Sequence, residues 1–243
     1  MSAALTFATA RRVLAQVRAD PRTLGLVIVL PCLLLWLVAW MFEGTDVLDR
    51  FGPLLLGLFP LIVMFLVTSV ATLRERTSGT LERLMASPIG RGDLIGGYAL
   101  GFGVLAVVQG LVLTGVAVGL LGMDVAGPLW VVMLVAVLDA ILGATLGLAA
   151  SALARTEFQA VQLMPLFVFP QLITCGLFMP RDQMPAVLEA VSRVLPLTYG
   201  VDALQRLAAG EGFADVRGDV LVIAGFIVGA VLVGATTLRR QTP

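Results

Sequence analysis

Histidine and lysine are both absent from the 243 residues of this chain. Without histidine there can be no Ser-His-Asp triad, no Cys-His pair and no histidine-ligated zinc site. Without lysine there can be no Walker A loop, because that loop uses a lysine ammonium to reach the terminal phosphates of a nucleotide. We therefore expect no catalytic residue and no metal site, and we exclude a P-loop motor on this chain.

Charged residues are scarce, at 13% of the chain, and sixteen arginines balance sixteen acidic residues. This balance gives no electrostatic basis for binding nucleic acid. Cys32 and Cys175 both lie in apolar runs, where a thiol behaves as a small hydrophobe rather than as part of a disulfide or metal site. The hydrophobic share is 59% and the mean hydropathy is +1.00, against about 45–50% apolar residues in a soluble domain. The composition indicates an integral membrane protein.

Long apolar stretches predict an all-α fold with six transmembrane helices, organised as a single transmembrane domain over residues 1–243. The first stretch, residues 24–42, contains no charge. At about 1.5 Å per residue it extends for about 28 Å, close to the thickness of the hydrocarbon layer. The six predicted spans are residues 24–42, 51–73, 94–122, 128–154, 158–179 and 220–238.

Proline and glycine inside these spans predict where helices bend and where they approach closely. Prolines should bend their helices, with the freed carbonyls bonded by neighbouring helices. Glycine pairs should allow close approach of helices. The prolines are Pro31, Pro60, Pro165 and Pro170, and the glycine pairs are Gly96 with Gly97, Gly143 with Gly147, and Gly225 with Gly229.

The positions of the arginines predict the orientation of the chain. Eleven of the sixteen lie in the N-terminal segment, in the loops after the second and fourth spans, or after the last span. The two short loops on the other side hold only Arg50. Because arginine-rich short loops stay in the cytoplasm, we expect both termini to be cytoplasmic.

Residues 3–19 combine an apolar face with arginines on the opposite side of the same helix. The pattern is typical of a helix that lies in the membrane interface. An ordinary basic flank that follows the positive-inside rule explains it equally well. The residues assigned to an interfacial helix are Phe7, Arg11, Arg12, Leu14 and Arg18, and Ala10, Val13 and Val17 complete the apolar face.

The loop at residues 74–93 contains a short helix with an apolar face, although it lies outside the membrane. Its first part reads R-E-R-T-S-G-T-L-E-R-L-M-A-S-P, and Pro88 prevents the helix from continuing. Leu81, Leu84 and Met85 follow the i, i+3, i+4 spacing of one helix face. Such a face fits the groove of a separate soluble domain, or it packs on the inner surface of the chain itself.

This loop resembles the signature R-E-R-x-x-G-T-L-E-x-L-x-x-x-P of ABC-2 type permeases, the family of daunorubicin-resistance-type exporters, in which it forms the coupling helix. A second stretch, residues 176–205, is similar to the family's segment G-x-x-x-P, M-P and N-P-L-T-Y-x-x-D-A-L-R. Leu195 here replaces the usual asparagine and Gln205 the usual arginine. The resemblance covers essentially the whole chain.

The resemblance implies the permease subunit of an ATP-driven exporter of a hydrophobic or amphipathic compound, such as a drug or lipid, in a prokaryotic plasma membrane. It implies a second permease, identical or not, and two copies of an ATP-binding subunit that carry ATP and Mg²⁺, with no cofactor on this chain. It also makes residues 180–196 a re-entrant or outer segment. The implied coupling residues are Glu75, Gly79, Thr80, Leu81, Glu82, Arg83, Leu84, Met85 and Pro88.

Asp139 is the single carboxylate well inside a predicted span, where a charge is costly, so it should face protein or water. It is either a proton site or contact for a cationic substrate, or a protonated acid bonded to a neighbouring helix. Gln109, Gln162 and Gln171 are further candidates for a transport pathway, or bonds between helices. An ion-driven secondary transporter would need several such ionisable groups. A polysaccharide or lipid-linked glycan exporter is the rival within the family.

Overall fold

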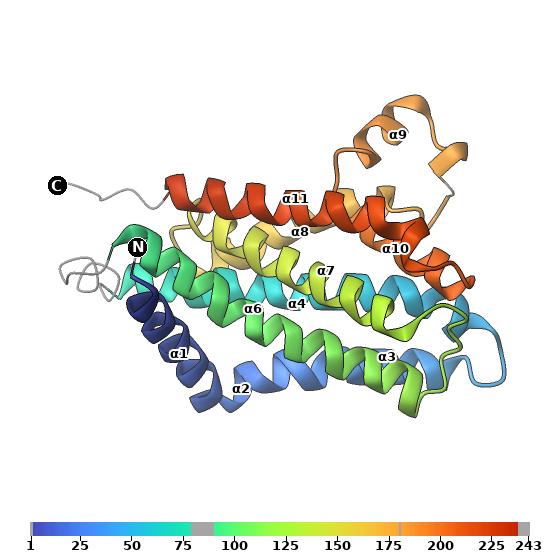
Figure 1. The fold of residues 1–243 in the computed structure, drawn as a ribbon, viewed down its shortest axis with the longest axis horizontal. Coiled ribbons are helices and arrows are strands. Elements are labelled where there is room, and N and C mark those ends of the chain that lie inside the picture. Colours follow the sequence, from blue (N-terminus) through green and yellow to red (C-terminus); the bar gives the residue numbers. More distant parts are fainter. Residues whose placement is uncertain (1, 79–89, 180, 238–243) are drawn as a thin grey trace.

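The structure of the chain, a computed structural model, describes residues 2–78, 90–179 and 181–237. These residues form a bundle of helices without strands (Figure 1). Within them, five helices are long and apolar enough to cross a membrane. The chain is therefore a multi-pass membrane protein. The five candidate spans are Pro21–Met41, Val47–Thr77, Gly92–Leu120, Leu129–Ser151 and Phe213–Gly234.

The helices follow one another along the chain with short connections. The N-terminal elements are α1 (Ala3–Ala19), α2 (Pro21–Leu24), the π-helical η1 (Gly25–Val29) and α3 (Leu30–Met41). The central elements are α4 (Val47–Thr77), α6 (Arg91–Gly115), η2 (Val116–Leu120) and α7 (Leu129–Ser151). The last elements are α8 (Glu157–Thr174), η3 (Arg181–Gln183), α9 (Ala186–Ser192), α10 (Leu197–Ala208) and α11 (Phe213–Thr237).

The predicted count of six spans is not confirmed by the described residues. The fifth prediction, residues 158–179, corresponds to α8, which ends at Thr174 and is not among the five candidates. Three glutamines and two prolines lower the hydropathy of this helix. The last span also begins earlier than predicted, because α11 starts at Phe213 and includes charged residues in its first turns.

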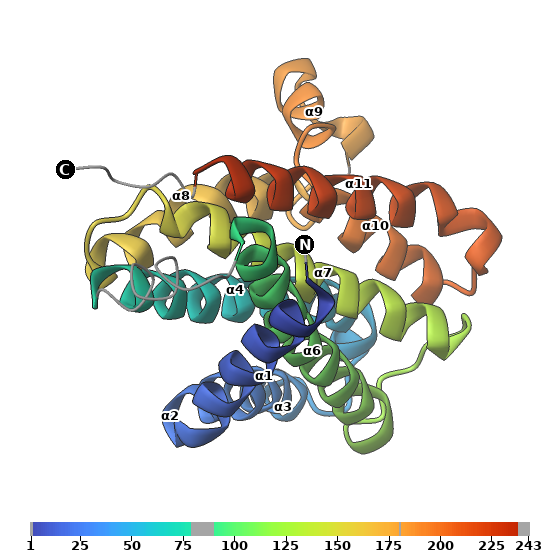
Figure 2. The same cartoon turned by 60° about the vertical axis from the view of Figure 1, so that its left-hand side comes forward.

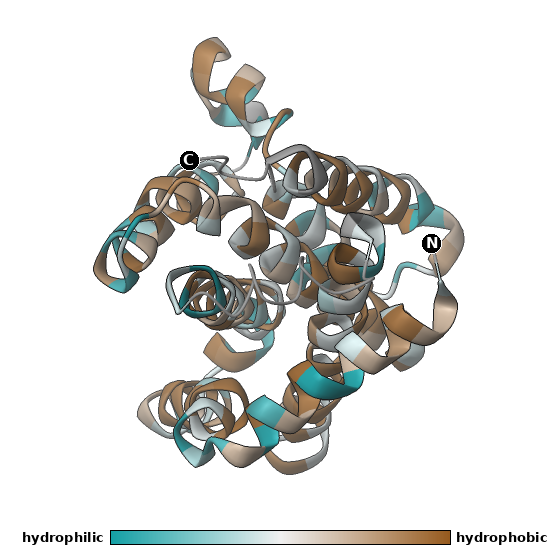
Figure 3. Ribbon diagram, turned by 90° about the vertical axis from the view of Figure 1, so that its left-hand side faces the viewer, coloured by the Kyte–Doolittle hydropathy of each residue, from teal (hydrophilic) through white to brown (hydrophobic). Residues whose placement is uncertain are grey.

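At the left of Figure 1, α4 ends and α6 begins, and we call this the α4–α6 end. Figure 3 looks along the helices from that end and shows apolar ribbon on the outer helices as well as in the interior. Leu33, Leu166 and Leu221 are among the exposed apolar residues. Such a surface suits contact with lipid rather than water.

Helices α4 and α7 form the centre of the bundle, in close contact along one stripe of each helix. A methyl group added at Gly143 would overlap the carbonyl oxygen of Leu61, and one added at Gly147 would overlap that of Phe65. The second contact lies four residues after the first in both α4 and α7. The two helices therefore run in the same direction, with Gly143 beside Leu61 and Gly147 beside Phe65. The close approach predicted from this glycine pair is thus made within the chain.

Helix α1 crosses obliquely below α6 in Figure 1 and packs against it. Its buried residues are Thr9, Ala10, Val13 and Val17, and a methyl group at Gly97 would overlap Thr9. Phe7, which was assigned to the same face, is instead 70% exposed. The inward face of α1 is therefore covered by protein, whereas Phe7 points away from it.

Pro31 has no N–H group to donate to the carbonyl of Val27, four residues earlier. Gln109 of α6 takes over this role, since its Nε2 donates to the Val27 carbonyl at 2.9 Å. The expectation that a neighbouring helix bonds a carbonyl freed by proline is met at this position. Gln109 thus joins α6 to the first span.

Substitution of Gln109 by leucine should lower the free energy of unfolding by about 1–2 kcal/mol, because the Val27 carbonyl loses its donor inside the bundle. Thermal unfolding in a mild detergent measures this change. Gln162→Leu is the matched control, because Gln162 is exposed, and it should change stability by less than about 0.5 kcal/mol. Equal effects of the two substitutions would contradict the assigned role.

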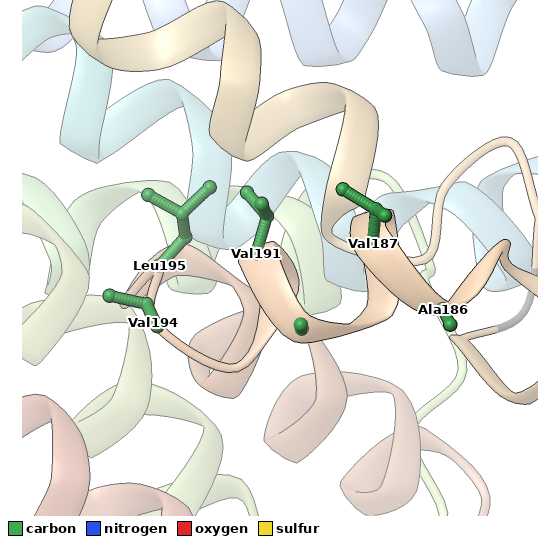
Figure 4. Close-up of a pocket in the computed structure, with 6 residues that line it drawn as sticks. Ala186, Val187, Val191, Val194 and Leu195 are labelled. Carbon is green, nitrogen blue, oxygen red and sulfur yellow. The ribbon is translucent and has the colours of Figure 1, made fainter.

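The segment 180–196, predicted as outer or re-entrant, contains η3 and α9. Helix α9 stands away from the bundle in Figures 1 and 2. Val187, Val191 and Leu195 point to the same side, toward α8 (Figure 4), and line an apolar crevice of about 630 Å³. Beyond it, α10 returns to the bundle and packs on α4, α7 and α11.

Candidate functional site

Three consecutive charged residues, Arg74, Glu75 and Arg76, are the first letters of the signature, and the structure places them in the last turn of α4. Each of them bonds a different part of the bundle. Arg74 forms a two-pronged ion pair with Glu157 at the start of α8, at 2.7 and 3.0 Å. Arg76 donates to the carbonyl of Ser151 at the end of α7, at 2.9 Å. The end of α4 is therefore bound to α7 and α8.

Glu75 makes the most buried of these contacts, with 11% of its side chain exposed. The two terminal nitrogens of the Arg12 guanidinium, Nη1 and Nη2, donate to its two carboxylate oxygens, at 2.5 and 3.0 Å. The hydroxyl of Tyr98 in α6 donates to the same carboxylate. Burial disfavours the charge on Arg12, but the hydrogen bond and charge of Glu75 outweigh it and raise the pKa of Arg12. Glu75 thus joins α1, α4 and α6.

We call the contacts of Arg74, Glu75 and Arg76 the α4 hub. Through the hub, the first residues of the signature loop are fixed to α1, α6, α7 and α8. A displacement applied to this turn must move these helices together or break charged contacts. This geometry is suited to passing a displacement from α4 to the other helices, and not to catalysing a reaction.

A groove of about 890 Å³ begins beside the hub and runs between α3 and α4. Its lining is apolar along most of its length, with residues such as Leu30, Phe59 and Val63. Its hub end is polar, where Asp20 and Arg74 line it. A single molecule bound in the groove would therefore contact both apolar and charged side chains.

Comparison with known proteins shows the family of the chain. The family model described as ABC-2 type transporter matches residues 4–207. The chain belongs to the ABC-2 type transporter family. The hub and the signature loop therefore lie within the matched region of this ABC-2 chain.

Three relatives illustrate the range of the similarity. ABC transporter G family member 20 of Dictyostelium discoideum is 27% identical over 201 residues, which are 82% of this ABC-2 chain and 28% of that protein. The probable multidrug ABC transporter permease YbhS of Escherichia coli is 29% identical over 182 residues, 74% of this chain and 48% of that protein. The linearmycin resistance permease protein LnrN of Bacillus subtilis is 27% identical over 201 residues, 81% of this chain and 51% of that protein. The chain thus spans about half or less of each relative's length.

Of the coupling residues implied by the resemblance, the structure places only Glu75, which takes part in the hub. The others lie outside the described residues, and their role stays a prediction. They are Gly79, Thr80, Leu81, Glu82, Arg83, Leu84, Met85 and Pro88.

The interfacial-helix residues divide between two sides of α1. Arg11 and Arg18 are exposed, as expected for its polar face. Arg12 was assigned to the same face but turns inward, because Glu75 offers it a carboxylate. Leu14 is half-buried. This pairing could not be predicted from periodicity, because the partners are 63 positions apart.

The four candidate pathway residues of this ABC-2 chain lie at separate places. Gln109 bonds Val27, as described above. Gln162 is exposed on α8. Gln171 bridges α8 and α10, because its Oε1 accepts from the N–H of Leu197 at 3.1 Å. Asp139 is fully buried and contacts α4 and α10.

Tyr98 is the functional candidate that sequence reasoning missed. It is fully buried, and a buried tyrosine usually bonds a partner through its hydroxyl. Only two tyrosines occur in the chain, and Tyr98 lies in an apolar stretch shortly after the signature loop. A tyrosine at that position could have indicated a buried hydrogen bond near the loop.

Proposed function

We propose that this chain is the membrane-spanning permease subunit of an ATP-driven exporter, with ATP and Mg²⁺ bound by a separate subunit. The observation that carries the proposal is the α4 hub, which fixes the start of the signature loop to four further helices. A motor subunit that grips Leu81, Leu84 and Met85 would act on the bundle through this hub. Two copies of that subunit and a second permease, identical or not, complete the transporter in our proposal.

The proposed cargo is a hydrophobic or amphipathic compound, such as a drug or lipid. The groove between α3 and α4 supports this class, because it combines a long apolar lining with a charged end. The names of YbhS and LnrN, which refer to multidrug transport and linearmycin resistance, agree with it.

The proposal places the α4–α6 end in the cytoplasm of a prokaryotic cell, with both termini on that side. This orientation follows the excess of arginine in the segments at that end. It also treats α8 as a sixth span and residues 180–196 as re-entrant. In support, the 18 residues of α8 extend for about 27 Å, and the start of α10 reaches α8 at Gln171.

Leu84→Asp tests the proposal, because a carboxylate on the apolar face of the loop should prevent docking of the motor. We expect substrate-stimulated ATP hydrolysis to fall at least about tenfold, since docking loses 1.4 kcal/mol or more. The measurement uses membranes in which the chain is expressed together with its co-purifying ATPase.

Leu153→Asp is the matched control, because Leu153 is an exposed leucine near the same end and precedes α8. This variant should keep normal coupling. Normal coupling in Leu84→Asp would remove the docking assignment, and purification without any ATPase would remove the proposed function.

A further inference from the structure

The carboxyl group of Asp139 lies at a junction of three helices. It extends from the middle of α7 between Gly57 of α4 and Gly200 of α10. A methyl group at Gly57 would lie 2.8 Å from Oδ2, and one at Gly200 would overlap both oxygens. Neither oxygen has a hydrogen-bond partner among the described residues, although both are buried. Two glycines thus make room for a carboxyl group that they do not bond.

The first turn of α10 forms one wall of this junction. Its first N–H group, from Leu197, donates to Gln171, and its fourth residue, Gly200, contacts Asp139. Thr198 in the same turn is fully buried, and its hydroxyl finds no partner in the part of the chain that the structure describes. The turn is therefore packed inside the bundle with two polar side chains that lack hydrogen bonds, Thr198 in the turn and Asp139 beside it.

An ionised carboxylate without a partner is strongly unfavourable in an apolar interior. The packed junction therefore requires Asp139 to carry a proton. In contact with water the same group would be ionised above about pH 4. The packed form consequently holds one proton more than a form in which water reaches the carboxyl group.

We propose that Asp139 is a proton-dependent latch for α10. With its proton bound, it permits the first turn of α10 to pack between α4 and α7. When that turn moves away, the proton passes to water and the carboxylate remains hydrated. The latch rests on the proposed function in one respect, because it assumes that α10 lies at one end of the transport route.

Within the described residues, no titratable group of α4, α7 or α10 bonds the Asp139 carboxyl group. Asp139 is the sole titratable residue of α7, and those of α4 lie in its first and last turns. The titratable side chains of α10 have other partners. Tyr199 donates to the Arg193 carbonyl, Asp202 pairs with Arg181, and Arg206 pairs with Glu211 and Asp219.

The test measures how often the first turn of α10 opens. Thr198→Cys is introduced into the full chain, with Cys32 and Cys175 replaced by alanine, and the protein is placed in lipid nanodiscs. A water-soluble thiol reagent then reports exposure of the new thiol from either side. Because the packed form holds one more proton, the open population should rise with pH above about pH 4, by up to about tenfold per pH unit.

The same chain with Asp139→Asn is the matched control, since asparagine keeps the shape but cannot ionise. It corrects for the titration of the thiol itself. We expect the rise in labelling with pH to be steeper with Asp139 than with Asn, by up to about tenfold per pH unit. Asp139→Ala should behave like Asp139→Asn and replaces it if the asparagine variant does not fold.

Equal pH profiles in the chains with and without Asp139 would overturn the latch, and so would a complete lack of labelling. The measurement needs neither ATP nor a partner subunit. A failure of the latch is therefore distinct from a failure of the proposed transport function, which the Leu84→Asp experiment tests.

Discussion

Glu75→Ala should lower the free energy of unfolding by about 3 kcal/mol, because it leaves the partly buried Arg12 without its carboxylate. It also removes the acceptor of the Tyr98 hydroxyl. The expected measurement is a large fall in the midpoint of thermal unfolding in detergent. Transport by any chain that still inserts should fall with it, since α1 and α6 lose their link to the end of α4.

Two further variants separate this effect from a general loss of charge. In the double variant Arg12→Met with Glu75→Leu, no unpaired charge remains, so much of the lost stability should return. Arg74→Ala breaks the pair with Glu157, in which 59% and 48% of the two side chains are exposed. It should cost less than about 1 kcal/mol. A double variant as unstable as Glu75→Ala would contradict the account of Glu75.

Gly143→Ala should have a similarly large effect, because the added methyl group would overlap the backbone of α4 at Leu61. Backbone atoms of two central helices cannot move apart locally, so the bundle must separate along the whole stripe. We expect a loss of about 3 kcal/mol or more, at the upper end of the effects of overpacking. The amount of folded protein recovered from membranes and its thermal unfolding midpoint measure this loss.

Gly225→Ala provides the control of opposite sign. Nothing lies within 4 Å of a methyl group at this position of α11. Alanine should therefore stabilise the helix by about 0.5–1 kcal/mol through its higher helix propensity. If both substitutions destabilise the protein equally, the close approach of α4 and α7 is not the cause.

Hydropathy alone predicted the first four spans to within a few residues, because the bilayer requires long apolar helices. It predicted the last span but placed its start at residue 220, whereas the helix begins at Phe213. The residues of the signature loop predicted the ABC-2 type family, which the family comparison confirms. The predicted fifth span, which corresponds to α8, was harder to delimit, because Pro165 and Pro170 lie in it and polar glutamines interrupt its apolar run. A hydropathy average cannot tell where such a helix ends.

The hub could not be predicted, because it depends on pairs that are distant in the sequence. The periodicity of residues 3–19 places Arg12 beside Arg11, and it contains no information about a carboxylate on another helix. The same holds for Asp139, whose position in a span was clear from the sequence. Its two glycine neighbours belong to α4 and α10, and only the packed bundle brings them together.

The consecutive order of Arg74, Glu75 and Arg76 restricts how α4 can move. Successive side chains leave a helix about 100° apart, so these three are distributed around most of its circumference. Rotation of α4 about its own axis would pull all three away from their partners at once. Sliding or tilting as a rigid body, with the attached helices following, keeps every contact. The end of α4 therefore resists rotation about the helix axis, whereas it can be displaced together with the helices bound to it.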